Sequence, residues 1–435
     1  MKFIFLGSDI LLFFSLLLIT WFLVRAIKRP ITRRAFNKLL SDKVVMLTLA
    51  ILLLYLLTAL LDSIHFQRSL NSVNNTTTQY SAKVESVLDL LFGQRARAEE
   101  KTYSAPFAIK SFLKELKPAG GQYYPKLIGV DNKIKNASDK RTDLFKQFFY
   151  AVMLSIISFV ILRKVLSNEY KFLAYIISSI CFVLSFTLFL ESHYHILGTD
   201  KVGHDVFYQT IKSIRTGLVI GLITTLVTMP FAIGFGLAAG YFGGKLDDII
   251  QYIYITLSSI PGVLLIAASI LSMQVFIANH PQVFDSLMAR SDARLISLCV
   301  ILGLTGWTGL CRVIRAETLK LREVDYIQAA KALGSSSFTI LTKHILPNVM
   351  HLILIAIVLD FSFLVLAEAV LSYIGVGVSP LTISWGNMIN GARMELAREP
   401  MVWWPILAAF IFMFLFVIST NILADKVRDV LDPRT

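Results

Sequence analysis

The chain has 435 residues, of which 55% are hydrophobic and 16% are charged, and its formal net charge is +13. A mean hydropathy of +0.67 excludes a water-soluble globular protein of this length, because charged side chains normally cover such a surface. The positive charge is dispersed in short segments beside apolar runs, which is typical of cytoplasmic loops and not of a nucleic-acid-binding face. The composition therefore indicates an integral membrane protein.

Apolar stretches long enough to cross a bilayer as helices occur along most of the chain. We expect nine, at about residues 5–24, 44–62, 147–166, 172–190, 214–239, 248–278, 294–314, 350–376 and 401–424. The predicted fold class is therefore an all-α polytopic membrane protein.

The first apolar stretch is followed by a basic segment, from Arg25 to Lys43. A cleavable signal peptide would carry its positive charge before the apolar core. We therefore expect a retained helix whose N-terminus lies outside and whose basic loop lies in the cytoplasm. With nine spans, the C-terminus is then cytoplasmic too, in a multi-pass protein of the cell (inner, cytoplasmic) membrane.

Residues 63–146 form the one long polar segment, and the alternation of spans places it outside. Apolar residues recur at helical spacing from Val84 to Leu91, and less strictly from Ile109 to Leu116, which predicts two short amphipathic helices. These helices either rest on the membrane or on the protein's own outer face, or they form a platform for an external partner.

The cytoplasmic loop after the seventh stretch, residues 316–348, has an ordered pattern. A run of good helix formers ends at Gly334, which can take the left-handed conformation of a helix C-cap. Ser335 and Ser336 can cap a second helix, and Pro347 is expected to close it just before the next span. Two short helices at an angle suit the docking of a partner, although an ordinary inter-span loop with good helix propensity would look similar.

This loop resembles the "EAA" loop of the permease subunits of binding-protein-dependent ABC importers, written E-A-A-x3-G-x9-I-x-L-P. Gln328 and His344 stand where Glu and Ile are typical, so an ion pair at position 328 is not expected. The predicted ATPase-coupling residues are Asp325, Gln328 and the five residues that match the motif: Ala329, Ala330, Gly334, Leu346 and Pro347. The resemblance implies that the loop is a coupling helix seated in a cleft of the ATPase subunit.

Other segments resemble the peptide/nickel branch of the same family, in particular the C-type permeases of dipeptide and oligopeptide transporters. The matching segments are HILGTDKVGHDV at 195–206, AGYFGG at 239–244, LAEAVLSYIGVG at 366–377, SWGNM at 384–388 and VRDVLDPR at 427–434. The resemblance is strong over about 195–435 and weak over 30–62. It implies a type I ABC importer permease core of six helices, here with three additional helices.

The expected domain organisation follows from this coverage. It comprises an extra N-terminal transmembrane helix with its basic loop (1–43), the first core span (44–62), an external insertion (63–146), an extra transmembrane hairpin (147–190) and the permease core (191–435) with the coupling loop 316–348.

The sequence closest to a Walker A loop begins with Ala239 in place of Gly and ends with Leu246 in place of Ser or Thr. We therefore expect a transport subunit, not an enzyme, without a cofactor of its own. The resemblance implies two ATPase subunits that use ATP and Mg²⁺, a second related permease and an external substrate-binding protein, with no nucleic-acid partner. The leading function is import of small peptides. The alternatives are import of nickel or another small solute, and a non-transporting assembly subunit.

Two acidic residues within the spans are candidates for the translocation pathway, because charge inside the membrane is costly and usually functional. Asp360 lies near the middle of the eighth stretch, where it either lines the pathway or pairs with a polar group of a neighbouring span. Glu368 matches the family's "AEA" and is expected to pack or gate near the outer half. His193, His195 and His204 gather near the outer surface, but without sulfur or paired carboxylates nearby they do not predict a metal site.

Overall fold

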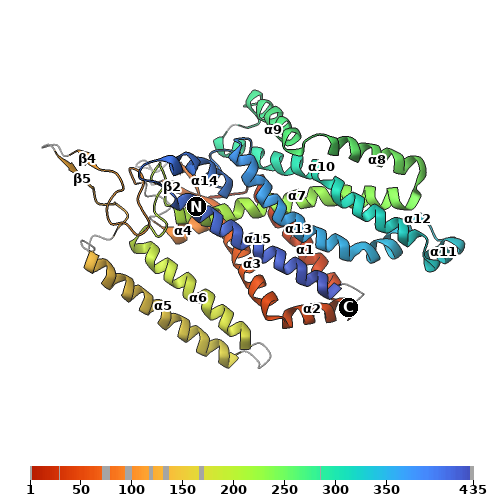
Figure 1. The fold of residues 1–435 in the computed structure, drawn as a ribbon, viewed down its shortest axis with the longest axis horizontal. Coiled ribbons are helices and arrows are strands. Elements are labelled where there is room, and N and C mark those ends of the chain that lie inside the picture. The colour runs from red at the N-terminus through yellow and green to blue at the C-terminus, as the bar shows by residue number, and fades with distance from the viewer. Residues whose placement is uncertain are drawn as a thin grey trace. The chain divides into compact units, whose positions relative to one another are not determined.

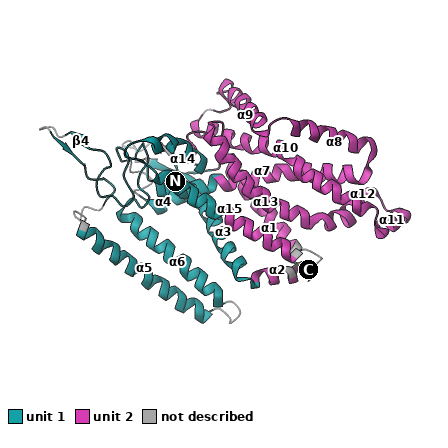
Figure 2. Cartoon of the chain, in the orientation of Figure 1, with its two compact units in different colours: residues 1–4, 41–216, 383–416 teal, residues 5–40, 217–382, 417–435 magenta. Residues whose placement is uncertain are grey.

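The computed structural model describes residues 2–28, 30–70, 79–93, 100–116, 121–130, 137–165, 171–284 and 286–431. The chain divides into two compact units, each assembled from separate stretches of sequence (Figure 2). Unit 1 comprises residues 1–4, 41–216 and 383–416, and unit 2 comprises residues 5–40, 217–382 and 417–435.

Within the described ranges, nine helices are long and apolar enough to cross a membrane. They are Gly7–Arg25, Lys43–Asp62, Ser138–Val165, Lys171–His193, Val206–Phe242, Gly262–Asn279, Leu287–Arg322, Ser337–Tyr373 and Trp404–Val430. The predicted all-α polytopic fold is confirmed.

Unit 1 contains three of these helices and a group of small elements at one end of them (Figure 1). The helices are α3 (Lys43–Asp62), α5 (Ala137–Val165) and α6 (Lys171–His193), of which α5 and α6 pack along one another. The small elements are β1 (Lys2–Ile4), β2 (His65–Leu70), β3 (Gln79–Ser86), α4 (Val87–Phe92), β4 (Glu115–Leu116), β5 (Gln122–Tyr123), α14 (Trp385–Ala392) and the 3-10 helix Arg393–Ala397. Strands β1, β2 and β3 form one antiparallel sheet in that order.

The prediction for the insertion is only partly right. Strand β3 continues to Ser86, and α4 begins only after it, because Ser86 and Asp89 form a reciprocal capping box. The helix predicted over Ile109 to Leu116 is wrong. This stretch is irregular up to β4, which pairs with β5, because its apolar side chains pack individually against distant segments; Phe112, for example, meets Trp404 at a ring-centroid distance of 5.2 Å.

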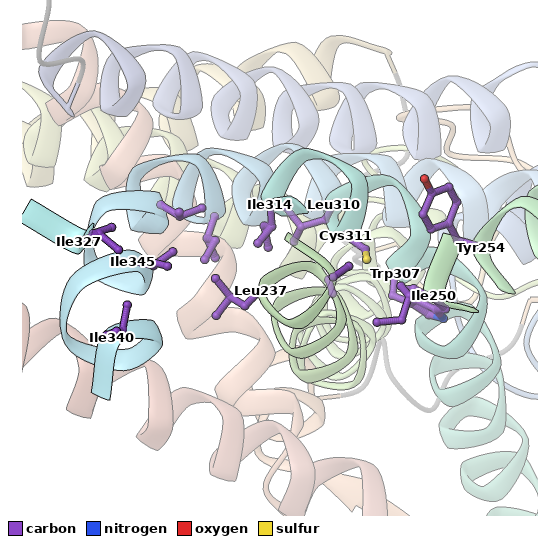
Figure 3. Packing of buried hydrophobic residues seen from close by; sticks show 14 residues of the cluster. Leu237, Ile250, Tyr254, Trp307, Leu310, Cys311, Ile314, Ile327, Ile340 and Ile345 are labelled. Atoms are coloured by element: carbon purple, nitrogen blue, oxygen red, sulfur yellow. The ribbon is translucent and has the colours of Figure 1, made fainter. Parts of the chain in front are cut away.

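Unit 2 contains the remaining helices, apart from the first parts of α7 and α15, and the loop at 316–348. Its elements are α1 (Gly7–Ile27), α2 (Pro30–Ser41, up to residue 40), α7 (Val206–Phe242, from residue 217), α8 (Gly244–Ser259), α9 (Gly262–Asn279), α10 (Leu287–Arg322), α11 (Asp325–Ala332), α12 (Ser337–Thr339), the π-helical segment Ile340–Ile345, α13 (Leu346–Tyr373) and the end of α15 (Trp404–Leu431). Figure 3 shows its core, in which Trp307 and Ile314 of α10 pack among side chains of α7, α8 and the loop.

The single helix predicted over 248–278 is wrong. The chain leaves helical geometry at Ile260, with φ −85° and ψ 131°, and α9 begins after Pro261. Proline lacks the N–H that would continue α8, and it disfavours helical geometry in the residue before it. Only α9 of the two helices is long and apolar enough to cross a membrane.

Candidate functional site

Helix α11 ends as the sequence predicts. Gly334 has φ +78°, and its N–H donates to the Lys331 carbonyl at 3.0 Å. The Ser335 N–H donates to the Ala330 carbonyl, also at 3.0 Å. This pair of bonds is a Schellman motif, which satisfies the last carbonyls of the helix and turns the chain sharply.

The second helix of the loop begins as predicted but does not end as predicted. The Ser336 hydroxyl accepts the Thr339 N–H at 3.3 Å, so Ser336 is the cap. The helix then continues through the π-helical segment Ile340–Ile345 into α13. Pro347 lies in the first turn of α13, where a missing N–H is tolerated, and therefore does not terminate the helix.

The loop is fixed to the core of unit 2 by three buried isoleucines. Ile327 comes from α11, and Ile340 and Ile345 come from the π-helical segment; they lie in one cluster with Ile314 of α10 (Figure 3). The same cluster includes residues of α13, so close packing joins the loop to both α10 and α13.

Polar contacts add to this attachment. The Gln328 side-chain amide donates to the Arg322 carbonyl at 2.9 Å, at the end of α10. The Asn348 amide donates to the Tyr326 hydroxyl at 2.8 Å and so joins α11 to the start of α13.

The predicted coupling residues divide into two groups. Ala330 and Leu346 are half-buried and pack against the core of unit 2. The others are exposed: Asp325, Gln328, Ala329, Gly334 and Pro347.

Two apolar side chains that are not among the predicted coupling residues flank Gly334. Leu333 is 86% exposed and Phe338 is 76% exposed. A contiguous patch of exposed apolar side chains is typical of a surface that binds a partner. The signal available in the sequence was their position on either side of the predicted turn.

A bidentate ion pair joins α8 to α10 beside this loop. Arg315 Nε and Nη2 lie 2.5 and 2.6 Å from the two carboxylate oxygens of Asp247. The hydrogen bonds from Arg315 lower the pKa of Asp247 and outweigh the opposing effect of burial. The pair holds the segment that follows the turn 239–244 against α10.

The two pathway candidates lie on α13 in different surroundings. Glu368 is buried, and its carboxylate accepts a hydrogen bond from the Ser372 hydroxyl at 2.6 Å. Asp360 is half-buried, on the same helix face as Ile353 and Leu364. Within the described part of the chain, Asp360 has no hydrogen bond or ion pair.

The three histidines noted in the sequence each face a different carboxylate. His193 lies 3.1 Å from Asp143. His195 and His204 lie 2.5 Å from Asp205 and 3.7 Å from Asp200, respectively. The rings therefore do not converge on one point.

Comparison with known proteins identifies the class of this chain. Residues 232–435 match the family described as "Binding-protein-dependent transport system inner membrane component". The dipeptide transport system permease protein DppC of Bacillus subtilis (strain 168) is 30% identical over 240 residues, which cover 55% of this chain and 69% of that protein.

Two further relatives show similar coverage. The glutathione transport system permease protein GsiD of Pectobacterium atrosepticum is 32% identical over 241 residues, 55% of this chain and 73% of that protein. The oligopeptide transport system permease protein OppC of Bacillus subtilis (strain 168) is 29% identical over 240 residues, which cover 55% of this chain and 72% of that protein. The chain belongs to the family of binding-protein-dependent transport system inner membrane components, as a multi-pass permease subunit and not an enzyme.

Proposed function

We propose that this chain is one of two related permeases in an ABC importer of small peptides. The relatives named for dipeptide, oligopeptide and glutathione transport support the substrate class. The observation that carries the ATPase-coupling role is the rigidly anchored loop with its exposed Leu333 and Phe338. Two separate ATPase subunits hydrolyse ATP with Mg²⁺, and an external binding protein delivers the peptide.

In this proposal the loop transmits the movement of the ATPases. Leu333 and Phe338 enter an apolar cleft of an ATPase subunit, and Ile327, Ile340 and Ile345 pass the displacement to the spans on either side of the loop. Asp325, Gln328, Ala329 and Gly334 lie on the surface that the ATPase covers.

The N-terminus lies outside and the C-terminus lies in the cytoplasm. Pairing of β1 with β2 supports a shared side for the residues before α1 and after α3, as two intervening spans require. Asp360 lines the translocation pathway, supported by its half-buried position and its lack of a partner in the described chain. Glu368 has a packing or gating role, supported by its burial and its bond to Ser372.

The test is reconstitution of the complete importer in liposomes, with uptake of a labelled dipeptide and ATP hydrolysis measured together. Leu333→Asp with Phe338→Asp should abolish binding-protein-stimulated hydrolysis and uptake, because two charges would enter an apolar cleft. Leu381→Asp is the matched control, since Leu381 is also exposed but lies outside the coupling loop.

Retention of stimulated uptake by the double variant would refute the coupling surface. ATP-dependent uptake of nickel, with no uptake of dipeptide, would refute the peptide assignment.

A further inference from the structure

Part of the insertion is interlocked with the family signature segment at 195–206. We call residues 100–116 and 121–130 the insertion lobe. The Glu100 N–H donates to the Gly203 carbonyl at 3.0 Å, and the Phe107 N–H donates to the His195 carbonyl at 2.9 Å. In the opposite direction, the Thr199 N–H donates to the Ser104 carbonyl at 3.1 Å.

Two glycines of the signature segment make this close approach possible. Gly198 and Gly203 have φ values of +69° and +92°. A Cβ atom on Gly203 would lie 1.7 Å from the Glu100 carbonyl oxygen, and one on Gly198 would lie 2.2 Å from that of Ser104. The backbone of the insertion lobe therefore occupies the space that side chains would need.

A buried charged group joins the same two segments. His195 Nδ1 lies 2.5 Å from an Asp205 carboxylate oxygen, and Nε2 lies 3.3 Å from one of Glu100. Because both ring nitrogens face carboxylates, His195 can donate to both only as the imidazolium. The Gly129 N–H also donates to Glu100, at 2.7 Å, so a second segment of the lobe is attached to the same carboxylate.

Aromatic contacts attach the lobe to a third segment of unit 1. The ring of Phe112 meets Trp404 edge-on, and the Trp404 indole N–H donates to the Thr199 carbonyl at 2.9 Å. Tyr103 is buried beneath the guanidinium of Arg398, 5.5 Å from the ring centroid. The insertion lobe is thus a fixed part of the permease and not a separately tethered domain.

The surface of this fixed lobe is basic, because one of its two acidic residues is buried and the other is paired with a lysine. Glu100 is buried and Glu115 pairs with Lys101 at 3.1 Å. The lysines are exposed: Lys101, Lys110, Lys114 and Lys126. Lys110 and Lys126 lie directly opposite each other in an isolated β-bridge, so two positively charged residues are close neighbours here.

Two apolar side chains of the same lobe are also exposed. Leu116 is 78% exposed and Ile128 is 71% exposed. The hairpin β4–β5, which includes Leu116, extends away from α5 and α6 within unit 1 (Figure 1). Exposed apolar groups together with like charges are typical of a protein-docking surface with a complementary partner.

We propose that the insertion lobe is a docking surface for an acidic face of the importer's external substrate-binding protein. The inference rests on the proposed function, which supplies the partner and places the lobe outside. Carboxylates of the partner would pair with the exposed lysines, while Leu116 and Ile128 are buried against it.

The experiment measures binding of the importer's own purified binding protein to the complete transporter in nanodiscs. Lys110→Glu with Lys126→Glu should weaken binding about tenfold at low salt and flatten its salt dependence, since charges at an interface act through screened attraction. Arg141→Glu with Lys146→Glu is the matched control, because both residues are exposed on α5 outside the lobe; it should bind like the wild type.

Leu116→Ser with Ile128→Ser should weaken binding at every salt concentration and so reports on the apolar part of the surface. Unchanged binding in both lobe variants, with stimulated ATP hydrolysis intact, would overturn the docking surface and leave the proposed function standing. A defect seen only with phosphatidylglycerol in the nanodisc, and not with phosphatidylcholine alone, would assign the lysines to lipid and also overturn it. A wild-type transporter that its binding protein does not stimulate would instead overturn the proposed function.

Discussion

At motif position 328, the side-chain amide of glutamine makes a contact that the carboxylate of glutamate could not make. Where the family pattern has glutamate, this amide donates to the Arg322 carbonyl at the end of α10. An ionised carboxylate has no hydrogen to donate and would face the negative end of the helix dipole. The substitution therefore attaches the coupling loop to α10 in a way that glutamate could not.

Gln328→Glu should loosen α11. Because the bond is solvent-exposed, we expect a cost of about 0.5–1 kcal/mol, or amide exchange in residues 325–333 roughly two to five times faster. Hydrogen exchange followed by mass spectrometry measures this. Gln328→Ala, which loses the bond without adding charge, should have a smaller effect, and equal exchange in all three proteins would contradict the assignment.

The ionisation of Glu100 makes the attachment of the insertion lobe dependent on pH. Burial would raise the pKa of Glu100, but hydrogen bonds from His195 and from two backbone N–H groups outweigh it and lower the pKa below its ordinary value of 4.5. A lowered pKa stabilises the folded state above the unfolded value, and this contribution is lost as the pH falls through the folded value.

A fluorophore attached at Lys101→Cys should therefore give a constant signal from neutral pH down to about pH 5 and change only in more acidic solution. Glu100→Gln cannot ionise and should remove this transition. An identical acid transition in both proteins would show that another group is responsible.

At the scale of elements, the turn between α11 and α12 favours glycine at position 334 because of its backbone conformation, and not because a side chain would lack space. A Cβ atom at Gly334 would meet nothing within 4 Å, so only the positive φ disfavours other residues. Gly334→Ala should cost about 1 kcal/mol and reduce binding-protein-stimulated ATP hydrolysis. Gly334→Asn should retain more of it, because asparagine tolerates this conformation. Equal losses would contradict the conformational explanation.

The ion pair between Asp247 and Arg315 belongs to the same scale, because it connects α8 to α10. Arg315→Lys should lose the two-point geometry although the charge is kept. In a double-mutant cycle of Arg315→Lys and Asp247→Asn, followed by thermal unfolding, we expect a coupling of about 1–3 kcal/mol. A coupling energy near zero would show that the ion pair adds no stability to the packing of the two helices.

Sequence patterns correctly predicted the structural features that depend on neighbouring residues alone. Gly334 and Ser336 act through their own backbone and hydroxyl, and both were identified from the sequence. The stretch from Ile109 to Leu116 failed because its apolar spacing fits a helix, whereas Phe112 packs on Trp404, almost three hundred residues later. Pro347 failed because the same residue that ends one helix is also favoured in the first turn of another.

At the scale of the whole molecule, the decisive test is to determine on which side of the membrane each terminus lies. Cysteines placed at Lys2 and Lys201 should react with a membrane-impermeant maleimide in intact cells, in a background without Cys181, Cys299 and Cys311. Cysteines at Lys331 and Asp425 should react only after lysis. Protection of the Lys2 site together with labelling of the Lys201 site would refute an external N-terminus.

The number of spans and the family were evident from the sequence, since both depend on long periodic segments and on a contiguous motif. The attachment of the insertion lobe was not. It depends on a histidine and a glutamate 95 positions apart and on two glycines whose neighbours no local pattern reveals. Such contacts are set by tertiary packing, which also explains why the exposed lysines did not suggest a common surface.

The small sheet also constrains how the protein is made. Strand β1 pairs with β2, so residues 2–4 emerge from the ribosome long before their partner, which must first follow α1 and α3 across the membrane. At roughly 5–20 residues per second, this interval is about 3–12 s. During that time the first strand has no partner strand, and a bulky tag fused directly ahead of Lys2 should slow assembly of the permease more than the same tag after the C-terminal helix.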